Sequence, residues 1–354
     1  MSLFGGKGFK PFVYPQLYDR WERHEKSHWL PHEVPMSEDV KDWKTRLNDN
    51  QRDFLTNIFR FFTQGDIDVA EAYHTEYLPF FKLPEAVMMM GGFAAREAVH
   101  IAAYSYLLET LGMPEAMYQE FLMYEEMKNK QDYIKKFSQS KHILGKGVEN
   151  LTSEDKEHIA AGIALFSGFT EGMQLFSTFA MLLIFPLNGL MKGMGKIVEW
   201  SIVDETQHTA GMIEVFKIFV AENLNADVEG ENQIRPDVLK ETVLKIAREM
   251  VGLEEAFIDL VFKKYKEKNE ISVEDGNKDF FGLTPKRLKA YIKYIADKRL
   301  EAMSYEPIFK IKENPLPELE VMIDAPVHTN FFENRAADYS NVATTGTWSE
   351  IWKD

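Results

Sequence analysis

The sequence contains no cysteine, which excludes disulfides, thiolate metal sites, iron–sulfur clusters and a cysteine nucleophile supplied by this chain. Basic residues are also scarce, since 41 Lys and Arg stand against 56 Asp and Glu and leave a net charge of −15. Such a charge disfavours binding to nucleic acid or to an anionic membrane surface. The N-terminus lacks the apolar stretch of a signal peptide. We therefore expect a cytoplasmic protein that binds neither nucleic acid nor a membrane.

Long apolar runs are rare as well, and the longest is interrupted by polar residues. The segment 163–186, IALFSGFTEGMQLFSTFAMLLIFP, has the length of a membrane span. Glu171 and Gln174 lie in its middle, where a lipid-facing helix would not tolerate them. The pattern predicts a helix buried in a protein core.

Apolar residues recur at helical spacing along most of the chain, and alternating strand patterns are scarce. The sequence therefore predicts an all-α fold. Residues 1–47 form an irregular segment with short helices, one of them opened by a capping box at Ser37. Residues 48–305 form the main helical domain. The predicted long helices cover 48–78, 83–112, 114–137, 153–186, 187–223, 237–267 and 285–304.

Residues 306–354 predict an extended tail, because four prolines break helices there and a small polar stretch follows. At its end, Trp348, Ile351 and Trp352 share one helical face. This face would either fold back on the core of this chain or dock as a peptide in the groove of a partner.

Two Glu-x-x-His motifs place a carboxylate and an imidazole one helical turn apart on the same face. They are Glu97–His100 and Glu205–His208, each in a predicted long helix with apolar neighbours. A helical bundle that binds two metal ions takes this pair from each of two helices and one further carboxylate from each of the other two.

The sequence offers such carboxylates at matching positions. Glu171 is the one acid between Ala160 and Pro186, and it lies 34 residues before Glu205. Asp66 lies 31 residues before Glu97, with Asp68 and Glu71 as rivals for the same role. The order acid, Glu-x-x-His, acid, Glu-x-x-His then describes two helical hairpins of similar length.

Four carboxylates and two imidazoles are oxygen and nitrogen donors that suit two Mn or two Fe ions and offset their charge. Without metal, buried carboxylates would repel one another at a cost of several kcal/mol each. Tyr104 lies one turn after His100 on the same face. It is either a core tyrosine or a phenol that the metal pair could oxidise.

These residues resemble the small (beta) subunit of class I ribonucleotide reductase. The resemblance covers roughly residues 15–340. Its motifs are HWLPHEVPMSEDVKDW, QGD at 64–66, LPE at 83–85, REAVH at 96–100 with Tyr104, FTEGMQLF, VDETQH at 203–208 and NFFENRAADYS.

The resemblance implies a ferritin-like helical bundle with additional helices, a flexible C-terminal tail and a homodimer. It implies that Asp66, Glu97 and His100 bind one ion and that Glu171, Glu205 and His208 bind the other. Trp29 and Asp204 look like an internal relay, and Tyr339 looks like the relay at the interface. The C-terminal aromatics Trp348 and Trp352, with Ile351, look like the peptide that binds the large (alpha) subunit.

In this family an oxidising equivalent travels to a cysteine of the large subunit and starts the reduction of ribonucleotides to deoxyribonucleotides. The oxidant would be either a Tyr104 radical or the oxidised dimanganese pair itself, and a mixed Mn/Fe pair is the less favoured metal content. The alternatives are a ferritin-like oxidase or monooxygenase acting on a bound ligand, and a metal-storage or structural helical protein. Such proteins do not need Trp29, Tyr104 and Tyr339 together.

Overall fold

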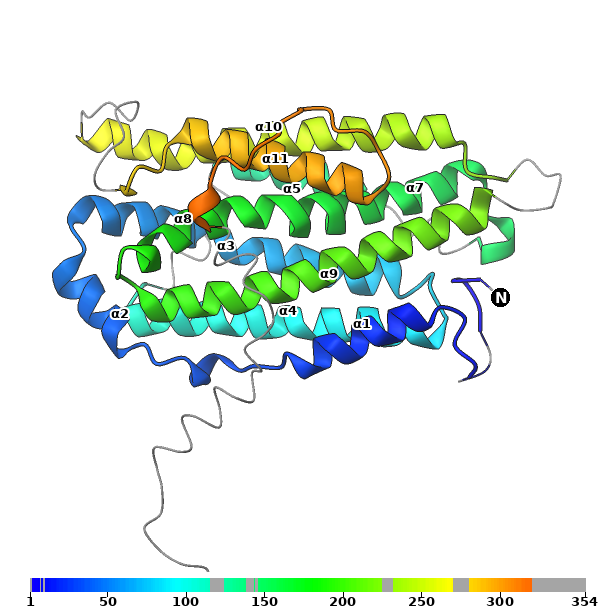
Figure 1. The fold of residues 1–354 in the computed structure, drawn as a ribbon, viewed down its shortest axis with the longest axis horizontal. Helices are drawn as coiled ribbons and strands as arrows, with labels where there is room; N and C mark the ends of the chain where they lie inside the picture. The colour runs from blue at the N-terminus through cyan, green and yellow to red at the C-terminus, as the bar shows by residue number, and fades with distance from the viewer. Residues whose placement is uncertain are drawn as a thin grey trace, which may run out of the picture.

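The structure, a computed structural model, is an elongated bundle whose long helices run close to its long axis (Figure 1). It describes residues 2–6, 8, 10–114, 124–137, 143, 146–224, 232–269 and 280–319, without the side chains of 60–66, 68 and 263–269. Within these residues the elements are α1 Pro15–Lys26, η1 Pro31–Glu33, α2 Ser37–Lys41, η2 Asp42–Arg46, α3 Asp49–Ala72, η3 Tyr73–Tyr77, α4 Pro84–Leu111, α5 Glu125–Lys135, η5 Val148–Asn150, α7 Ser153–Ile163, η6 Ala164–Gln174, α8 Leu175–Leu187, α9 Lys192–Leu224, α10 Pro236–Asn269 and α11 Pro285–Ala302.

The all-α prediction is confirmed, since the only β pairing in the described part of the chain is an isolated bridge between Ser2 and Gly5. Local signals account for several helix ends. Asn48 and Gln51 form a capping box at the start of α3, and Thr152 and Asp155 form another at α7. Pro84 occupies the first turn of α4, and Gly112 ends that helix in the left-handed conformation.

The predicted capping box at Ser37 is wrong. Met36 is the N-cap of α2, its side chain makes no capping bond, and Ser37 is already helical. Asp39 instead accepts hydrogen bonds from the backbone N–H groups of Gly193 and Met194, at 2.8 Å each. The acidic residues of this segment therefore cap the start of α9 rather than their own helix.

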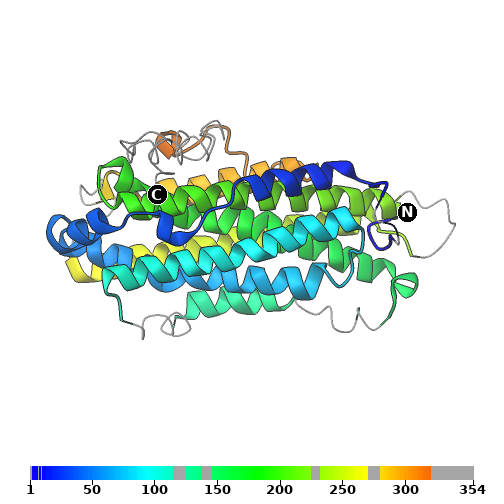
Figure 2. The same ribbon diagram turned by 90° about the horizontal axis from the view of Figure 1, so that it is seen from below.

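The apolar run forms one continuous helical stretch of α7, η6 and α8. By length and composition it could cross a membrane, but its most apolar window lies entirely inside the protein. The predicted buried core helix is confirmed. The stretch packs against α9, α10 and α11, and α3 and α4 complete the bundle (Figure 2). Helix α1 lies along α4 and α9 and covers them from outside.

The middle of this stretch, η6, is π-helical, with backbone bonds to the fifth residue along instead of the fourth. The close approach of neighbouring side chains requires Gly172 here. A Cβ at this position would lie 2.8 Å from Thr209 Cγ2 and 2.9 Å from Arg299 Nε. Arg299 Nε also donates to the Gly172 carbonyl at 2.7 Å. The wider turn that carries Glu171 is thus held from α11.

The first part of the predicted tail is anchored to the domain. The backbone N–H groups of Ile308 and Phe309 each donate to Asp297 Oδ1 of α11 at 2.9 Å. Further along, Leu316 and Leu319 are buried.

Candidate metal centre

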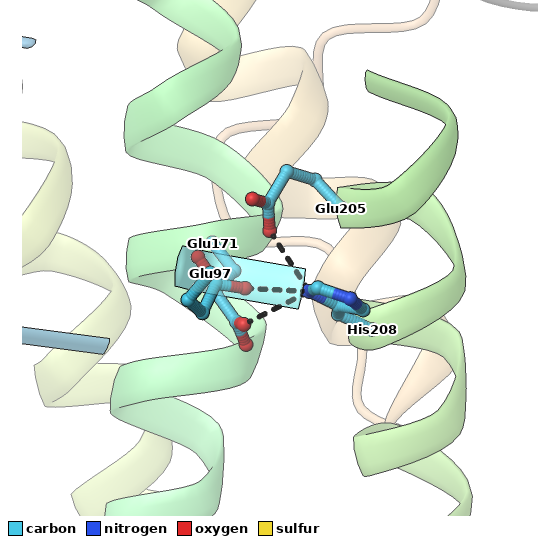
Figure 3. Close-up of side chains that lie close together, drawn as sticks. All are labelled: Glu97, Glu171, Glu205 and His208. Carbon is cyan, nitrogen blue, oxygen red and sulfur yellow. Dashed lines mark ion pairs between the residues drawn. The ribbon is translucent and has the colours of Figure 1, made fainter. Parts of the chain in front are cut away.

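Four predicted ligand side chains meet at the centre of the bundle (Figure 3). They are Glu97 from α4, Glu171 from η6, and Glu205 and His208 from α9, and one donor atom of each lies within 4.8 Å of the others. All four are buried. One complete Glu-x-x-His motif, the glutamate of the other motif and one lone carboxylate, drawn from three helical segments, are therefore brought to one place.

His208 points Nδ1 at this cluster, 2.9 Å from Glu97 Oε1, 3.5 Å from Glu205 Oε2 and 3.6 Å from Glu171 Oε1. His100 points its own Nδ1 from the other side, 3.1 Å from Glu205 Oε1 and 3.4 Å from Glu97 Oε2. The two imidazole rings lie 6.1 Å apart. Glu97 and Glu205 therefore each face both imidazoles.

The donor set fits two metal ions. Both oxygens of Glu97, Oε2 of Glu205, and Nδ1 of His100 and of His208 are buried and make no well-formed hydrogen bond, although they approach one another to 2.9–3.5 Å. Buried polar atoms are rarely left unsatisfied, and metal coordination would satisfy all of these at once. The mixture of carboxylate oxygen and imidazole nitrogen suits Mn or Fe. The Asp66 side chain lies outside the described part of the structure, although its backbone belongs to α3.

Without metal, the charges of this site are strongly coupled. Burial, helped by the neighbouring carboxylates of Glu205 and Glu97, raises the pKa of Glu171 to about 7. Burial alone would lower the pKa of His100 and His208. The carboxylates around them outweigh burial and raise the pKa of both imidazoles well above the ordinary value. In the metal-free protein these side chains therefore hold protons that metal binding must release.

The outer nitrogen of His100 is bound to a buried network. His100 Nε2 lies 3.1 Å from Asp204 Oδ2, in position to donate to it. The same oxygen accepts the indole N–H of Trp29 at 2.7 Å, and Arg96 Nη1 donates to Asp204 from 3.2 Å. Trp29 also stacks on the His100 ring at 5.9 Å. Asp204 thus connects one predicted ligand with the indole.

The outer nitrogen of His208 meets a second histidine. His208 Nε2 lies 3.1 Å from Nε2 of the buried His24, so one imidazole donates and the other accepts. Burial and the neighbouring His208 lower the pKa of His24 to about 2, which keeps His24 neutral. Helix α1 approaches closely enough for this contact because Gly92 of α4 has no Cβ, which would lie 3.0 Å from Glu25 Oε1.

Glu171 also has a partner outside the cluster. The buried Tyr73 donates its hydroxyl to Glu171 Oε1 at 3.0 Å. Tyr77, one turn on, packs edge-on against Tyr73 and has its hydroxyl 3.4 Å from Ser167 Oγ. Tyr73 therefore contacts a predicted ligand, and the hydroxyl of Tyr77 contacts a residue outside the ligand set.

Tyr104 is buried, and its hydroxyl donates to Ser201 Oγ at 2.9 Å. Ser201 lies one turn before Glu205 on α9. The Tyr104 phenol is thus hydrogen-bonded to a residue of α9.

Of the residues predicted for the site, the structure brings together Glu97, His100, Glu171, Glu205, His208, Asp204 and Trp29. Tyr339 and the peptide residues Trp348, Ile351 and Trp352 lie outside the described residues. Sequence reasoning missed His24, Tyr73 and Arg96. Two of these had a usable signal, because Tyr73 lies two turns after Asp66 and Arg96 directly precedes Glu97.

Comparison with protein families gives a match to "Ribonucleotide reductase, small chain" over residues 7–315. The chain is 75% identical to "Probable ribonucleoside-diphosphate reductase small subunit 376L" of Invertebrate iridescent virus 6, with 99% of each chain covered. It is 45% identical to the small subunit named 048L of Invertebrate iridescent virus 3, over 96% of this chain and 86% of that protein.

Solved structures share the fold. The ribonucleotide reductase R2 subunit of Clostridium botulinum superimposes with a TM-score of 0.74 at 19% identity, over 91% of this chain and 94% of that one. The dimanganese(II)-NrdF of Streptococcus sanguinis gives a TM-score of 0.66 at 17% identity, over 90% and 99% of the two chains.

Proposed function

Because this chain belongs to the ribonucleotide reductase small-chain family and is the small subunit of an oxidoreductase, we propose that it generates the oxidising equivalent for ribonucleotide reduction. Its dinuclear centre, of two Mn or two Fe ions, would be held by Asp66, Glu97, His100, Glu171, Glu205 and His208. The observation that carries the proposal is the convergence of buried carboxylate and imidazole donor atoms of Glu97, Glu205, His100 and His208 that make no well-formed hydrogen bond.

When bound, the metal pair supplies one-electron redox chemistry. The protein supplies charge balance, because four carboxylates offset two divalent cations. It also supplies orientation, since Asp204 and His24 hold the outer nitrogens of His100 and His208 and leave both Nδ1 atoms aimed inward.

The relay begins with Trp29. When its indole loses an electron, the Nε1 proton is already hydrogen-bonded to Asp204, which can take or return it over 2.7 Å. Tyr339 of the tail would be the next stop toward the large subunit. The cysteine oxidised at the end of the relay belongs to that large subunit, because this chain has no cysteine.

The resting oxidant is either a Tyr104 radical or the oxidised dimanganese pair. The hydrogen bond from Tyr104 to Ser201, at 2.9 Å, fixes the orientation of the phenol, and replacement of Tyr104 by phenylalanine distinguishes the two oxidants.

The protein would act in the cytoplasm as a homodimer and bind the large subunit through Trp348, Ile351 and Trp352. The alternative of a ligand-oxidising ferritin-like enzyme is not favoured by the family match, which covers residues 7–315.

The test is a deletion of residues 340–354, which leaves Tyr339 in place. We expect two metal ions per chain, as in the full chain, and no reduction of ribonucleoside diphosphates with the large subunit. Y339F is the companion variant, and it should bind the large subunit but support no turnover. Full activity of the deletion variant would contradict the proposal, and so would a metal content well below two ions in the full chain.

A further inference from the structure

Tyr73 of η3 lies against the proposed ligands on the side of His208. Its hydroxyl donates to Glu171 Oε1 at 3.0 Å, and the same oxygen lies 3.6 Å from His208 Nδ1. The rings of Tyr73 and His208 lie 6.3 Å apart and meet edge to face. The hydroxyl proton of Tyr73 is therefore shared with a carboxylate that belongs to the proposed ligand set.

Trp29 has a comparable arrangement on the side of His100. Asp204 Oδ2 accepts its indole N–H and lies 3.1 Å from His100 Nε2. Phenol and indole are the aromatic side chains that lose one electron most readily, so each side of the centre has one oxidisable ring. Trp29 is separated from the proposed metal pair by two residues, whereas Tyr73 is separated from it by Glu171 alone.

The surroundings of Tyr73 shield it from solvent. Its side chain is 0% exposed. In the described part of the chain, its ring packs against Tyr77, Phe93 and His208, and all three are themselves buried. A radical on Tyr73 would therefore be out of reach of reductants in solvent and would persist until an electron and a proton return to the phenol.

We propose that Tyr73 is a redox-active phenol that stores the oxidising equivalent of the metal pair on the His208 side. This inference rests on the proposed function, which supplies the oxidation of the metal pair. Trp29 would carry the equivalent toward the large subunit, and Tyr73 would hold it within the core.

The step is a coupled transfer of one electron and one proton. Tyr73 gives one electron to the oxidised metal pair and its hydroxyl proton to Glu171 Oε1, across the 3.0 Å hydrogen bond. The O–H bond of Tyr73 breaks, an O–H bond forms on Glu171, and the metal pair is reduced by one electron. The net charge of the buried site stays the same, which avoids the cost of an unpaired charge in the core. The reverse step restores the phenol.

Electron paramagnetic resonance of the metal-loaded, oxidised protein tests this assignment. The background is Y104F, which removes the other tyrosine predicted beside the ions. We expect a tyrosyl radical in Y104F and in Y104F/Y77F, and its loss in Y104F/Y73F. Y77F is the matched control, because Tyr77 is a buried tyrosine that packs on Tyr73. Metal analysis at saturating metal checks that each variant holds two ions.

A second protein separates the redox chemistry of Tyr73 from its contact with Glu171. A ring-fluorinated tyrosine in place of Tyr73 keeps the hydroxyl that donates to Glu171. Its fluorine nuclei should split the radical signal in the Y104F background. The same amino acid in place of Tyr77 should leave the signal unchanged.

An oxidised Y104F protein without a tyrosyl radical would overturn the proposal, and so would a signal that the fluorinated residue at position 73 does not alter. Neither result bears on the proposed function. Failure of that function would appear in the wild type, as a metal pair that is not oxidised or as no ribonucleotide reduction with the large subunit. Circular dichroism and thermal melting check that each variant is folded.

Discussion

Asp204 accepts the indole N–H of Trp29 at 2.7 Å while its carboxylate also faces His100 and Arg96, and all four side chains are buried. The carboxylate thus neutralises the Arg96 guanidinium inside the core and fixes both the indole and the imidazole. A single buried charge links the stability of the bundle to the geometry of the proposed relay.

D204N should therefore be strongly destabilising, because it leaves the Arg96 guanidinium buried without its carboxylate. We expect the free energy of unfolding to fall by about 3–5 kcal/mol, measured by urea denaturation. The control is D19N, which changes an exposed aspartate and should stay within about 0.5 kcal/mol of wild type. Similar unfolding curves for D204N and D19N would show that Arg96 does not depend on this carboxylate.

Y104F tests which oxidant is used. Because the substitution removes the hydrogen bond to Ser201 and leaves all six proposed ligands in place, we expect Y104F to keep two metal ions, and turnover with the large subunit retained in Y104F would assign the oxidant to the metal pair. Metal analysis, electron paramagnetic resonance and a reductase assay check this. An inactive Y104F with full metal content would instead assign the oxidant to the Tyr104 radical.

Much of the fold follows from the sequence. The predicted helix over 48–78 appears as α3 and η3, which end at Tyr77, and the helix over 83–112 appears as α4, Pro84–Leu111. These boundaries were readable because apolar periodicity, Pro84 and Gly112 are local signals. The function of Asp39 was not readable, because its hydrogen-bond partner Met194 lies 155 residues away.

Some residues of the site were likewise predictable from the sequence, and others were not. The spacing of Glu-x-x-His places Glu97 and His100 on one face whatever the rest of the chain does. The contact of His24 with His208 joins residues 184 apart, and it depends on how α1 lies on α4 and α9. No local pattern encodes that packing, so this partner was visible only in three dimensions.

Y73F should weaken metal binding. The hydroxyl of Tyr73 donates a hydrogen bond to the proposed ligand Glu171. Loss of such a hydrogen bond to a metal ligand lowers metal affinity by about 10–100-fold. Y77F is a matched control, since Tyr77 is an adjacent buried tyrosine whose hydroxyl faces Ser167. Competition with a chromophoric chelator measures both affinities. Equal affinity in Y73F and Y77F would remove Tyr73 from the outer contacts of the site.

His24 can be tested by pairing a polar with an apolar replacement. H24L removes the hydrogen-bond partner of His208 Nε2. We expect the affinity for the metal ion that His208 would bind to fall by about 10–100-fold. H24Q offers an amide group at this position and should restore metal binding close to wild type. The same chelator titration, with electron paramagnetic resonance of the bound ions, compares the metal affinities of H24L and H24Q. If both variants bound metal equally well, His24 would be a packing residue only.

The proton on Glu171 should make a contribution to the stability of the metal-free protein that is lost as the pH rises. The pKa of Glu171 is about 7 in the folded protein against 4.5 ordinarily, so the folded state binds its proton more tightly than the unfolded state. This contribution is fully present below pH 4.5 and is lost by the time the pH passes about 7, which amounts to about 3 kcal/mol. The lowered pKa of His24 acts in the opposite direction below about pH 6.5, so the Glu171 contribution is measured as a difference between variants. The raised pKa values of His100 and His208 act in the same direction as Glu171 at higher pH.

E171Q removes the titrating group of this pH dependence while keeping the shape of the side chain. Urea unfolding of the chelator-treated proteins from about pH 5 to about pH 8 should show the free energy of unfolding of the wild type falling relative to that of E171Q. Bound metal should reverse the trend in the wild type, because deprotonated ligands bind it more tightly as the pH rises. Parallel stability curves for the two metal-free proteins would mean that Glu171 is ionised in the folded state throughout this range.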